Sequence, residues 1–577
     1  MKSASALALV LVLLSTASTA LAVPQSDPDS GARDYVLGRF AADNDKLLDA
    51  ARFADAARQR DPSDPAVAQR AFDLAIVAGD ERLAVTLANG LAATGKGDST
   101  VALVRLADAL DRRDWKAADA ARAGIADVGY AAVIAPIVEG WILFGRGDTD
   151  LALAKLDPTA MTGFAKSYVA EARAHMLAAA RKYAPAAAAY HELRAGTGPG
   201  ISFLVVGEAD ALQQSGDKAG AATLLAGAND DAVVTQARAR LAAGKRIGGL
   251  ASDPRTGVAW VCARLATDLS RDKPVALALV FARVATFLAP DNAASWLVAG
   301  DVLARSSYDD AALAAYGKIG ANEALATAAR ARRADVLGDA GRGAEAEAAL
   351  VAATKAADAD SEAWARLGDW QRKAERYADA AKSYGRAVDL APGGKPAWIL
   401  YFLRGSTLEQ AGNWSLAEPD LRTALAMAPD EPTVLNYLGY AMLDRGQDVP
   451  AAKALVERAS QLKPDDGFIA DSLGWAQYRL GDMAAAVKTL ERAAAAEPGD
   501  PTINEHLGDA YWRSGRRIEA RFRWRAAIDL DPTPKARATL ASKLDYGLDV
   551  AQRLAANTVA VAPKETGAWT ANTPPRN

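Results

Sequence analysis

The side chains that most often perform chemistry are scarce in this chain of 577 residues, which has three histidines and one cysteine. His191 and the glutamate after it begin like a zinc-protease helix, but Ala195 stands where the second histidine is required. Gly90 to Lys96 matches most of a phosphate-binding loop, but Gly97 replaces the serine or threonine that binds magnesium. We therefore expect no metal, no cofactor and no catalytic role.

The composition indicates helices. Hydrophobic residues make up 51% of the chain but aromatic residues only 7%, because alanine is abundant. Alanine is the best helix former and allows helices to pack closely. The net charge of −4 gives no indication of nucleic acid binding. The single cysteine, Cys262, cannot form an internal disulfide, and we expect it to be a small buried hydrophobic residue.

The stretch from Ser361 to Pro532 repeats itself, and its last three closing prolines are 34 residues apart. Four Leu-Gly pairs open segments that end at a proline. These pairs and prolines are Leu367-Gly368 with Pro392, Leu438-Gly439 with Pro464, Leu473-Gly474 with Pro498, and Leu507-Gly508 with Pro532. A fifth segment keeps Gly405 and Pro429 but has Arg404 where leucine is expected.

Each segment has the pattern of two helices joined by a turn. Between Ile503 and Asp531, small or apolar residues recur at spacings of three and four, which places them on one helix face. Ser514-Gly515 interrupts this pattern. A single hairpin of this kind cannot bury its apolar face, so neighbouring hairpins must stack into a solenoid.

These segments resemble the tetratricopeptide repeat, a helical hairpin of about 34 residues. The residues that carry the resemblance in two segments are Trp364, Leu367, Gly368, Ala380, Tyr384, Ala387 and Pro392, and Gly508, Tyr511, Ala520, Trp524, Ala527 and Pro532. Gln371 replaces the usual tyrosine in the first of these segments. The resemblance implies an all-α fold, an α-solenoid of stacked hairpins that forms a right-handed superhelix.

The N-terminus has the features of a secretory signal, namely Lys2, an apolar core at 6–14 and the cleavage pattern Ala20-Leu21-Ala22. Cleavage after Ala22 would release a mature protein into the periplasm. The alternative is an uncleaved N-terminal anchor. No cysteine lies near the cleavage point, so we expect no lipid anchor and, at most, peripheral contact with a membrane.

The rest of the chain is predicted to contain about 13 to 15 helical hairpins. Glycine-rich breaks suggest a division near 245–255, although one continuous superhelix is the alternative. The predicted segments are a signal peptide at 1–22, a flexible leader at 23–33, degenerate hairpins at 34–250, repeat-like hairpins at 251–357, five clear repeats at 358–533, a capping helix at 534–556 and a disordered tail at 557–577.

In tetratricopeptide proteins the first helix of each hairpin lines the concave surface, and the resemblance therefore implies a binding groove. The residues at or beside the groove positions of the last repeats are Asn436, Tyr437, Tyr440, Asp471, Trp475, Tyr478, Arg479, Glu505, Asp509 and Trp512. Aromatic residues there offer contact area, and the polar residues can hydrogen-bond a peptide. For Tyr437 and Tyr478, packing between repeats is an equal alternative.

Some family members grip a terminal carboxylate with lysine and asparagine, but acids occupy several of those positions here and would repel a carboxylate. The last repeat also carries a cluster of arginines: Arg513, Arg516, Arg517, Arg521, Arg523 and Arg525. This cluster is either a solvated outer face or a docking patch for an acidic protein or an anionic membrane surface.

Two functional hypotheses follow. The first is a periplasmic, non-catalytic scaffold or adaptor that binds a protein or peptide, such as a periplasmic protease or an envelope assembly factor. Long bacterial envelope repeat proteins are similar, and some are lipoprotein adaptors of carboxy-terminal processing proteases. The second is a component of polysaccharide export or cell-envelope glycan assembly that recruits a glycan-handling enzyme.

Overall fold

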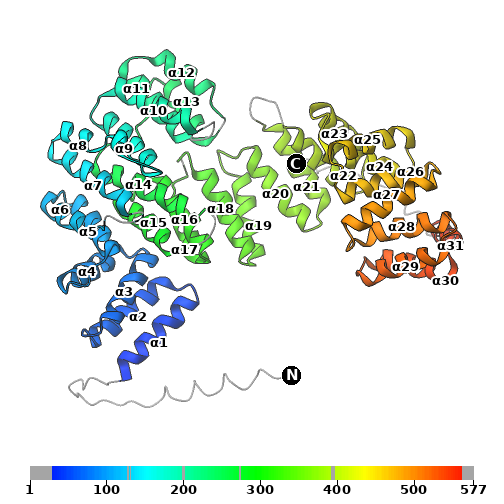
Figure 1. Cartoon of the computed structure of the whole chain (residues 1–577), viewed down its shortest axis with the longest axis horizontal. Helices are drawn as coiled ribbons and strands as arrows, with labels where there is room; N and C mark the ends of the chain where they lie inside the picture. Colours follow the sequence, from blue (N-terminus) through cyan, green and yellow to red (C-terminus); the bar gives the residue numbers. More distant parts are fainter. Residues whose placement is uncertain are drawn as a thin grey trace, which may run out of the picture. The chain divides into compact units, whose positions relative to one another are not determined.

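The protein is an all-α solenoid, shown as a computed structural model in Figure 1. The structure describes residues 29–126, 129, 131–197, 202–229, 231–271, 275–321, 323–391 and 397–561, and these residues form α-helices, one short 3-10 helix and no strand. The chain divides into two compact units, Met1–Ala353 (unit 1) and Thr354–Asn577 (unit 2). Within each unit, consecutive helices form antiparallel hairpins that stack on their neighbours.

The helices of unit 1 are α1 (Asp29–Asp43), α2 (Leu47–Arg60), α3 (Pro65–Ala78), α4 (Glu81–Ala93), α5 (Ser99–Asp111), α6 (Trp115–Ala123), α7 (Ala131–Arg146), α8 (Thr149–Lys155), the 3-10 helix η1 (Pro158–Ala160), α9 (Ala165–Ala179), α10 (Tyr183–Thr197), α11 (Ser202–Ser215), α12 (Lys218–Ala226), α13 (Ala232–Ala242), α14 (Pro254–Leu269), α15 (Ala276–Leu288), α16 (Ala293–Arg305), α17 (Asp309–Tyr316), α18 (Ala326–Asp339) and α19 (Gly343–Thr354), which reaches the boundary between the units.

The helices of unit 2 are α20 (Ser361–Lys373), α21 (Tyr377–Asp389), α22 (Trp398–Gln410), α23 (Trp414–Met427), α24 (Pro432–Asp444), α25 (Val449–Leu462), α26 (Gly467–Arg479), α27 (Met483–Ala496), α28 (Pro501–Arg513), α29 (Arg517–Asp529), α30 (Pro534–Tyr546) and α31 (Leu548–Val561).

Aspartate defines the start of many of these helices. At α3, Asp64 accepts hydrogen bonds from the backbone N–H groups of Ala66 at 2.8 Å and Val67 at 3.4 Å. These N–H groups have no partner inside the helix, so such a cap contributes about 1 kcal/mol. The same role falls to Asp98, Asp231, Asp360, Asp466 and Asp500.

The two helices of a hairpin approach closely where the first carries a glycine. A Cβ atom added to Gly474 would lie 2.6 Å from the Leu490 side chain, so no larger residue fits without movement. The glycine and the large side chain that covers it are usually 16 residues apart. The pairs are Gly300 with Tyr316, Gly368 with Tyr384, Gly405 with Leu421, Gly439 with Val456, Gly474 with Leu490 and Gly508 with Trp524.

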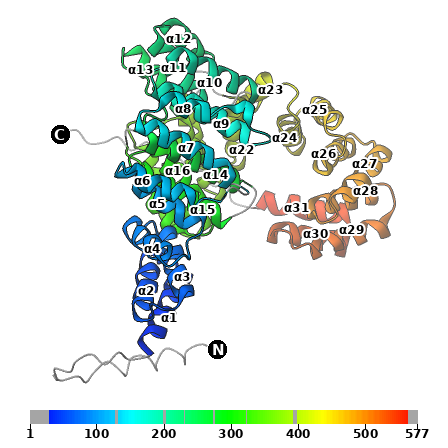
Figure 2. The same ribbon diagram turned by 60° about the vertical axis from the view of Figure 1, so that its left-hand side comes forward.

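Unit 1 is not a simple row of hairpins, because α14 and α15 pack against helices far earlier in the chain. α14 contacts α5, α7 and α9, and α15 contacts α3 and α5 (Figures 1 and 2). The buried Arg283 of α15 donates from Nε and Nη2 to the carbonyl oxygen of Val77 near the end of α3, at 3.0 and 2.6 Å. The first helices of the early hairpins are therefore covered by a hairpin of the same chain.

The segment from α11 to α13 has a separate small core and returns to α14 through residues 243–253. The buried Asp210 of α11 accepts from Arg246 Nη2 at 3.1 Å and from the backbone N–H of Gly248 at 2.9 Å. Gln213 accepts from the N–H of Ile247 at 2.9 Å. This glycine-rich connector is thus held in place by two polar side chains of α11.

The predicted segments can now be placed. The predicted division near 245–255 does not separate the two units, because α14 and α15 pack against helices of the range 34–250. The boundary between the two compact units follows Ala353. Helix α1 already begins at Asp29, inside the predicted leader. Two helices, α30 and α31, follow the last repeat because Gly547, at a φ of 80°, separates them, and α31 continues to Val561.

The signal peptide and most of the predicted tail lie outside the described residues. Among the helices that the structure describes, none is long and apolar enough to cross a membrane.

The close contact between α14 and α7 gives a stability prediction. A Cβ atom at Gly257 would lie 2.0 Å from the fully buried indole of Trp141. Gly257→Ala should therefore lower the free energy of unfolding of unit 1 by about 1–3 kcal/mol, because the rigid ring has to move. Urea denaturation followed by circular dichroism measures the effect.

The matched control is Gly90→Ala in α4, where no atom lies within 4 Å of the added Cβ. This exposed helical position should gain about 0.5–1 kcal/mol, since alanine restricts the unfolded chain more than glycine does. Equal effects of the two substitutions would contradict the close packing of α14 on α7.

Candidate binding groove

The predicted groove residues come mainly from three successive first helices of unit 2, namely α24, α26 and α28, which contact one another in order. Three rings form a stack there. Trp475 lies between Tyr478, with centroids 4.7 Å apart and an interplanar angle of 8°, and His506, at 4.2 Å and 14°. Tyr440 lies 6.5 Å from His506 in a tilted arrangement. The structure thus brings four aromatic side chains together.

Asp471 is buried under this stack. Its two carboxylate oxygens lie 3.0 and 2.9 Å from His506 Nδ1. Burial disfavours the charged imidazole, but the carboxylates of Asp471, Asp509 and Glu505 outweigh burial and raise the pKa of His506 above 6.5. An imidazolium at this position both neutralises Asp471 and stacks on the electron-rich face of Trp475.

Asp509 and Glu505 of α28 bind a lysine from the capping helices. The buried Lys543 of α30 donates to Asp509 at 2.8 Å and to Glu505 at 2.6 Å. Burial opposes the charge on Lys543, but these two carboxylates raise its pKa above the usual value. Asp509, which is only 3% exposed, also accepts from Trp524 Nε1 at 2.9 Å. The polar side chains that were predicted to meet a ligand here are therefore bound within the chain.

Trp512 is covered by the end of the solenoid. Its Nε1 donates to Asp549 of α31 at 3.1 Å. A Cβ atom at Gly547 would lie 2.5 Å from the indole, so this ring lies directly against the turn between α30 and α31. Arg513 also bonds to Asp549, and its Nη2 donates to Gln552 at 3.0 Å.

Tyr437 and Arg479 join neighbouring repeats. The Tyr437 hydroxyl donates to the Ser406 carbonyl at 3.2 Å and to Glu409 at 3.0 Å. Arg479 donates to the carbonyl oxygen of Leu443 at 2.8 Å. These contacts are packing contacts between hairpins.

Asn436 differs from its neighbours. Its Oδ1 atom is shielded from solvent and receives no hydrogen bond from the described residues. A buried acceptor without a donor costs about 1–3 kcal/mol, so it is an uncommon feature in a folded protein. Asn436 lies four residues before Tyr440, on the same face of α24.

The arginine cluster on α28, α29 and the turn between them is exposed except for Arg523, which is half-buried and donates to Asn504 at 3.1 Å. Arg516 pairs with Glu491 at 2.9 Å and Glu519 at 3.0 Å. Two further arginines of the cluster lie near an aromatic ring, and one is exposed to solvent. Arg517 and Arg521 lie 5.2 and 5.8 Å from the centre of the Trp512 ring, and Arg525 is exposed. Contacts within the chain therefore offset part of this positive charge.

The sequence analysis missed the roles of His506 and Lys543, the two cations that neutralise the groove acids. One signal was available for Asp509. In three repeats an aspartate follows the glycine at the close contact of the hairpin and accepts a hydrogen bond from an aromatic residue 15 positions later. These pairs are Asp301 with Tyr316 at 2.8 Å, Asp369 with Tyr384 at 2.6 Å and Asp509 with Trp524 at 2.9 Å.

No cluster of metal-ligating side chains occurs among the described residues. Cys262 is buried, and burial raises the pKa of its thiol far above the usual range. His175 is also buried, and burial lowers its pKa to about 3. These environments suit packing and do not assemble a nucleophile with a base.

The stacked hairpins and the glycine pairs are the features of a helical repeat protein. The tetratricopeptide repeat family matches residues 331–395, 402–467 and 472–540, so this part of the chain consists of tetratricopeptide repeats. Repeats of this family generally bind protein or peptide partners and are generally non-catalytic.

Two curated relatives match short parts of the chain. A TPR repeat-containing protein of Pseudomonas aeruginosa is 39% identical over 85 residues, which is 15% of this chain and 14% of that protein. Bacteriophage adsorption protein A of Escherichia coli is 31% identical over 119 residues, or 20% of this chain and 12% of that protein. The chain thus covers only a small part of each relative's length.

Solved structures of tetratricopeptide proteins resemble part of the fold. A protein from Parabacteroides merdae has a TM-score of 0.34 and 16% identity, covering 41% of this chain and 94% of that one. A thermophilic protein of Thermus thermophilus has a TM-score of 0.28 and 22% identity, covering 32% and 98%.

The buried lysine gives a second stability prediction. Lys543→Met should lower the free energy of unfolding of unit 2 by about 3–5 kcal/mol, because the buried Asp509 and the half-buried Glu505 would lose their cation. Denaturant titration of the whole chain measures this, with hydrogen exchange locating the loss in α28 and α30.

Arg537→Met is the control on the same helix. Arg537 pairs with Asp531 at 2.7 Å, but these side chains are 45% and 94% exposed. The exposed pair should contribute about 0–1 kcal/mol. A loss for Lys543→Met no larger than for Arg537→Met would show that the buried cluster is not formed.

The stability of unit 2 should depend on the protonation of His506. Its pKa is raised in the folded state, so its contribution is fully present below pH 6.5 and is lost as the pH rises through that raised pKa. Hydrogen-exchange protection of α26 and α28, corrected for intrinsic exchange rates, should fall over this interval. His506→Gln should flatten the dependence, and an unchanged profile in that variant would refute the assignment.

Proposed function

We propose that this protein is an exported periplasmic scaffold that holds a protein or peptide against the α24–α26 face of unit 2. The signal features at residues 1–22 support export, and the repeats support partner binding. In unit 1, α14 and α15 already contact the first helices α3, α5, α7 and α9. This packing favours unit 2 as the place where a partner is bound along the repeats.

The observation that carries the proposal is the neighbourhood of Tyr440. This half-buried side chain has its pKa raised to about 12 by burial and by nearby carboxylates, including Asp471 and Asp444. His506 neutralises Asp471, whereas Asp444 is exposed at the end of α24. With the exposed Asp444 four residues after Tyr440, this face suits an extended peptide that supplies a basic side chain.

Within this role, we propose an adaptor for a periplasmic protease or an envelope assembly factor. The arginine cluster would then be a second docking surface, for an acidic protein or an anionic membrane. The exposed Ile518 and Phe522, each 72% exposed, lie among these arginines on α29 and would add apolar contact. No lipid anchor is part of this proposal.

The test is quantitative capture from a cell-envelope extract with the mature chain as bait. The double variant Asn436→Ala with Tyr440→Ala should recover a partner at least about tenfold less well, as expected for central interface residues. Leu416→Ala, which removes an exposed apolar side chain of α23, is the matched control and should capture normally. N-terminal sequencing of the exported protein should begin at Val23.

Three outcomes would contradict parts of this proposal. Equal capture by the double variant and the wild type would remove the α24–α26 face from partner binding. Retention on envelope polysaccharide without any protein partner would favour the glycan-assembly role instead. An intact N-terminus beginning at Met1 would favour an uncleaved anchor.

A further inference from the structure

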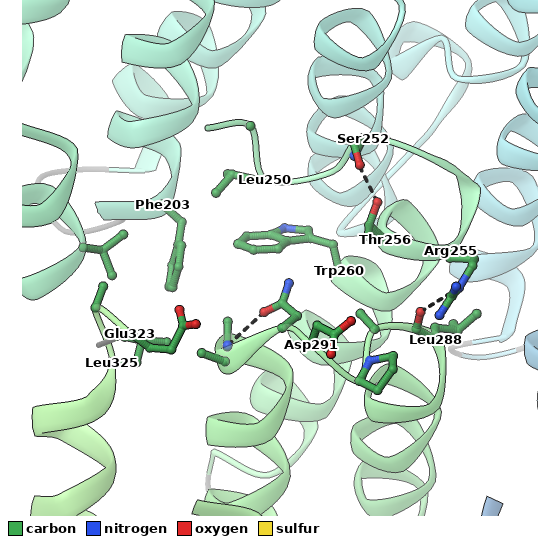
Figure 3. Close-up of a pocket in the computed structure, with 18 of the residues that line it drawn as sticks. Phe203, Leu250, Ser252, Arg255, Thr256, Trp260, Leu288, Asp291, Glu323 and Leu325 are labelled. Atoms are coloured by element: carbon green, nitrogen blue, oxygen red, sulfur yellow. Dashed lines mark hydrogen bonds between the residues drawn. The ribbon is translucent and has the colours of Figure 1, made fainter. Parts of the chain in front are cut away.

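Unit 1 contains a cavity of about 530 Å³ that the proposed partner groove does not include (Figure 3). It is bordered by α11, α13, the connector after α13, the N-terminal half of α14, the α15–α16 turn and the residues before α18. A cavity of this size can hold an amino-acid side chain with part of its backbone. The residues that line the cavity come from several helices and loops between Phe203 and Leu325.

Two aromatic side chains form one wall of the cavity. Phe203 and Trp260 meet edge to face, with ring centroids 5.2 Å apart and planes at 76°. The indole is fixed in position, because Trp260 Nε1 donates to the buried Glu171 at 2.7 Å. Arg264 pairs with the other oxygen of Glu171, so this carboxylate is neutralised outside the cavity. The cavity therefore has a rigid aromatic wall before anything binds.

The charged side chains that line the cavity fall into two groups. Asp253 caps α14 by accepting from the N–H of Thr256 at 3.0 Å. Arg255 donates to the carbonyl of Leu288 at 3.1 Å and pairs with Asp111 at 2.9 Å. These two side chains therefore hold the wall together.

The second group consists of Asp291 and Glu323, which are exposed carboxylates at the cavity. In the view of Figure 3 both lie below the Trp260 ring, whereas Leu250 and Ser252 lie above it. Among the described residues that line the cavity, Arg255 is the only cation, and it is already paired with Asp111. The free charge in the cavity is therefore negative and lies beside an aromatic wall.

The geometry points to a binding site for an arginine side chain of an extended peptide. A guanidinium group is planar, so it can stack on the indole while it donates two parallel hydrogen bonds to one carboxylate. Glu323 would accept these bonds, and Asp291 would add a second negative charge. A lysine could satisfy the charge but not the planar, two-point contact. This site is separate from the α24–α26 face and goes beyond the function proposed for it.

The test uses the whole chain and two capped pentapeptides, Gly-Ser-Arg-Ser-Gly and the same peptide with citrulline, which keeps the shape of arginine but has no charge. Isothermal titration calorimetry should give an affinity for the arginine peptide at least about tenfold higher than for the citrulline peptide. Glu323→Gln together with Asp291→Asn should remove this preference, because both carboxylates would be neutral.

Asp339→Asn is the matched control, since it removes one exposed carboxylate of unit 1 outside the cavity and should retain the preference for arginine. The Asn436→Ala, Tyr440→Ala variant should also retain it, which separates this site from the groove of unit 2. Equal affinities for the two peptides, or no measurable binding of either, would overturn the inference. So would a preference for arginine that survives the Glu323 and Asp291 substitutions.

Discussion

The constraint on which the structure depends is the distance between the two helices of a hairpin. At Gly368, Gly474 and Gly508 the first helix has no side chain, and a tyrosine, leucine or tryptophan of the second helix fills that space. A large residue thus packs directly on backbone, and each hairpin becomes a flat unit that can stack on the next one. The many alanines extend the same principle along both helices, because small side chains let packed helices approach closely.

This constraint explains which parts of the fold could be predicted. The glycine and its covering residue lie within one hairpin, so their spacing is visible in the sequence, and the repeats of unit 2 follow from it. The packing of α14 and α15 on α3 to α9 could not be predicted, because contacts such as that between Arg283 and Val77 follow no period. The repeat-like hairpin with Gly300 and Tyr316 likewise gives no information about which distant helices the neighbouring hairpin of α14 and α15 contacts.

The groove residues illustrate a similar limit. Their positions on the first helices of the repeats follow from the register, and the structure gathers Tyr440, Trp475 and Tyr478 around one ring stack. The neutralisation of the groove acids does not follow from this register, because the cations that pair with Asp471 and Asp509 come from other hairpins. His506 neutralises Asp471 across a distance of 35 residues, and Lys543 reaches Asp509 from 34 residues later in the chain. A pattern of acids in one repeat therefore cannot reveal whether they are free to bind a ligand.

The covering of the early hairpins by α14 and α15 also has a consequence for biosynthesis. Arg283 bonds to a carbonyl oxygen 206 residues earlier, so the first nine helices leave the ribosome long before their covering helices exist. During that interval the nascent chain exposes apolar surface, which makes it vulnerable to aggregation and a substrate for chaperones. The repeats of unit 2, whose contacts are mostly between sequence neighbours, can instead fold one after another as they emerge.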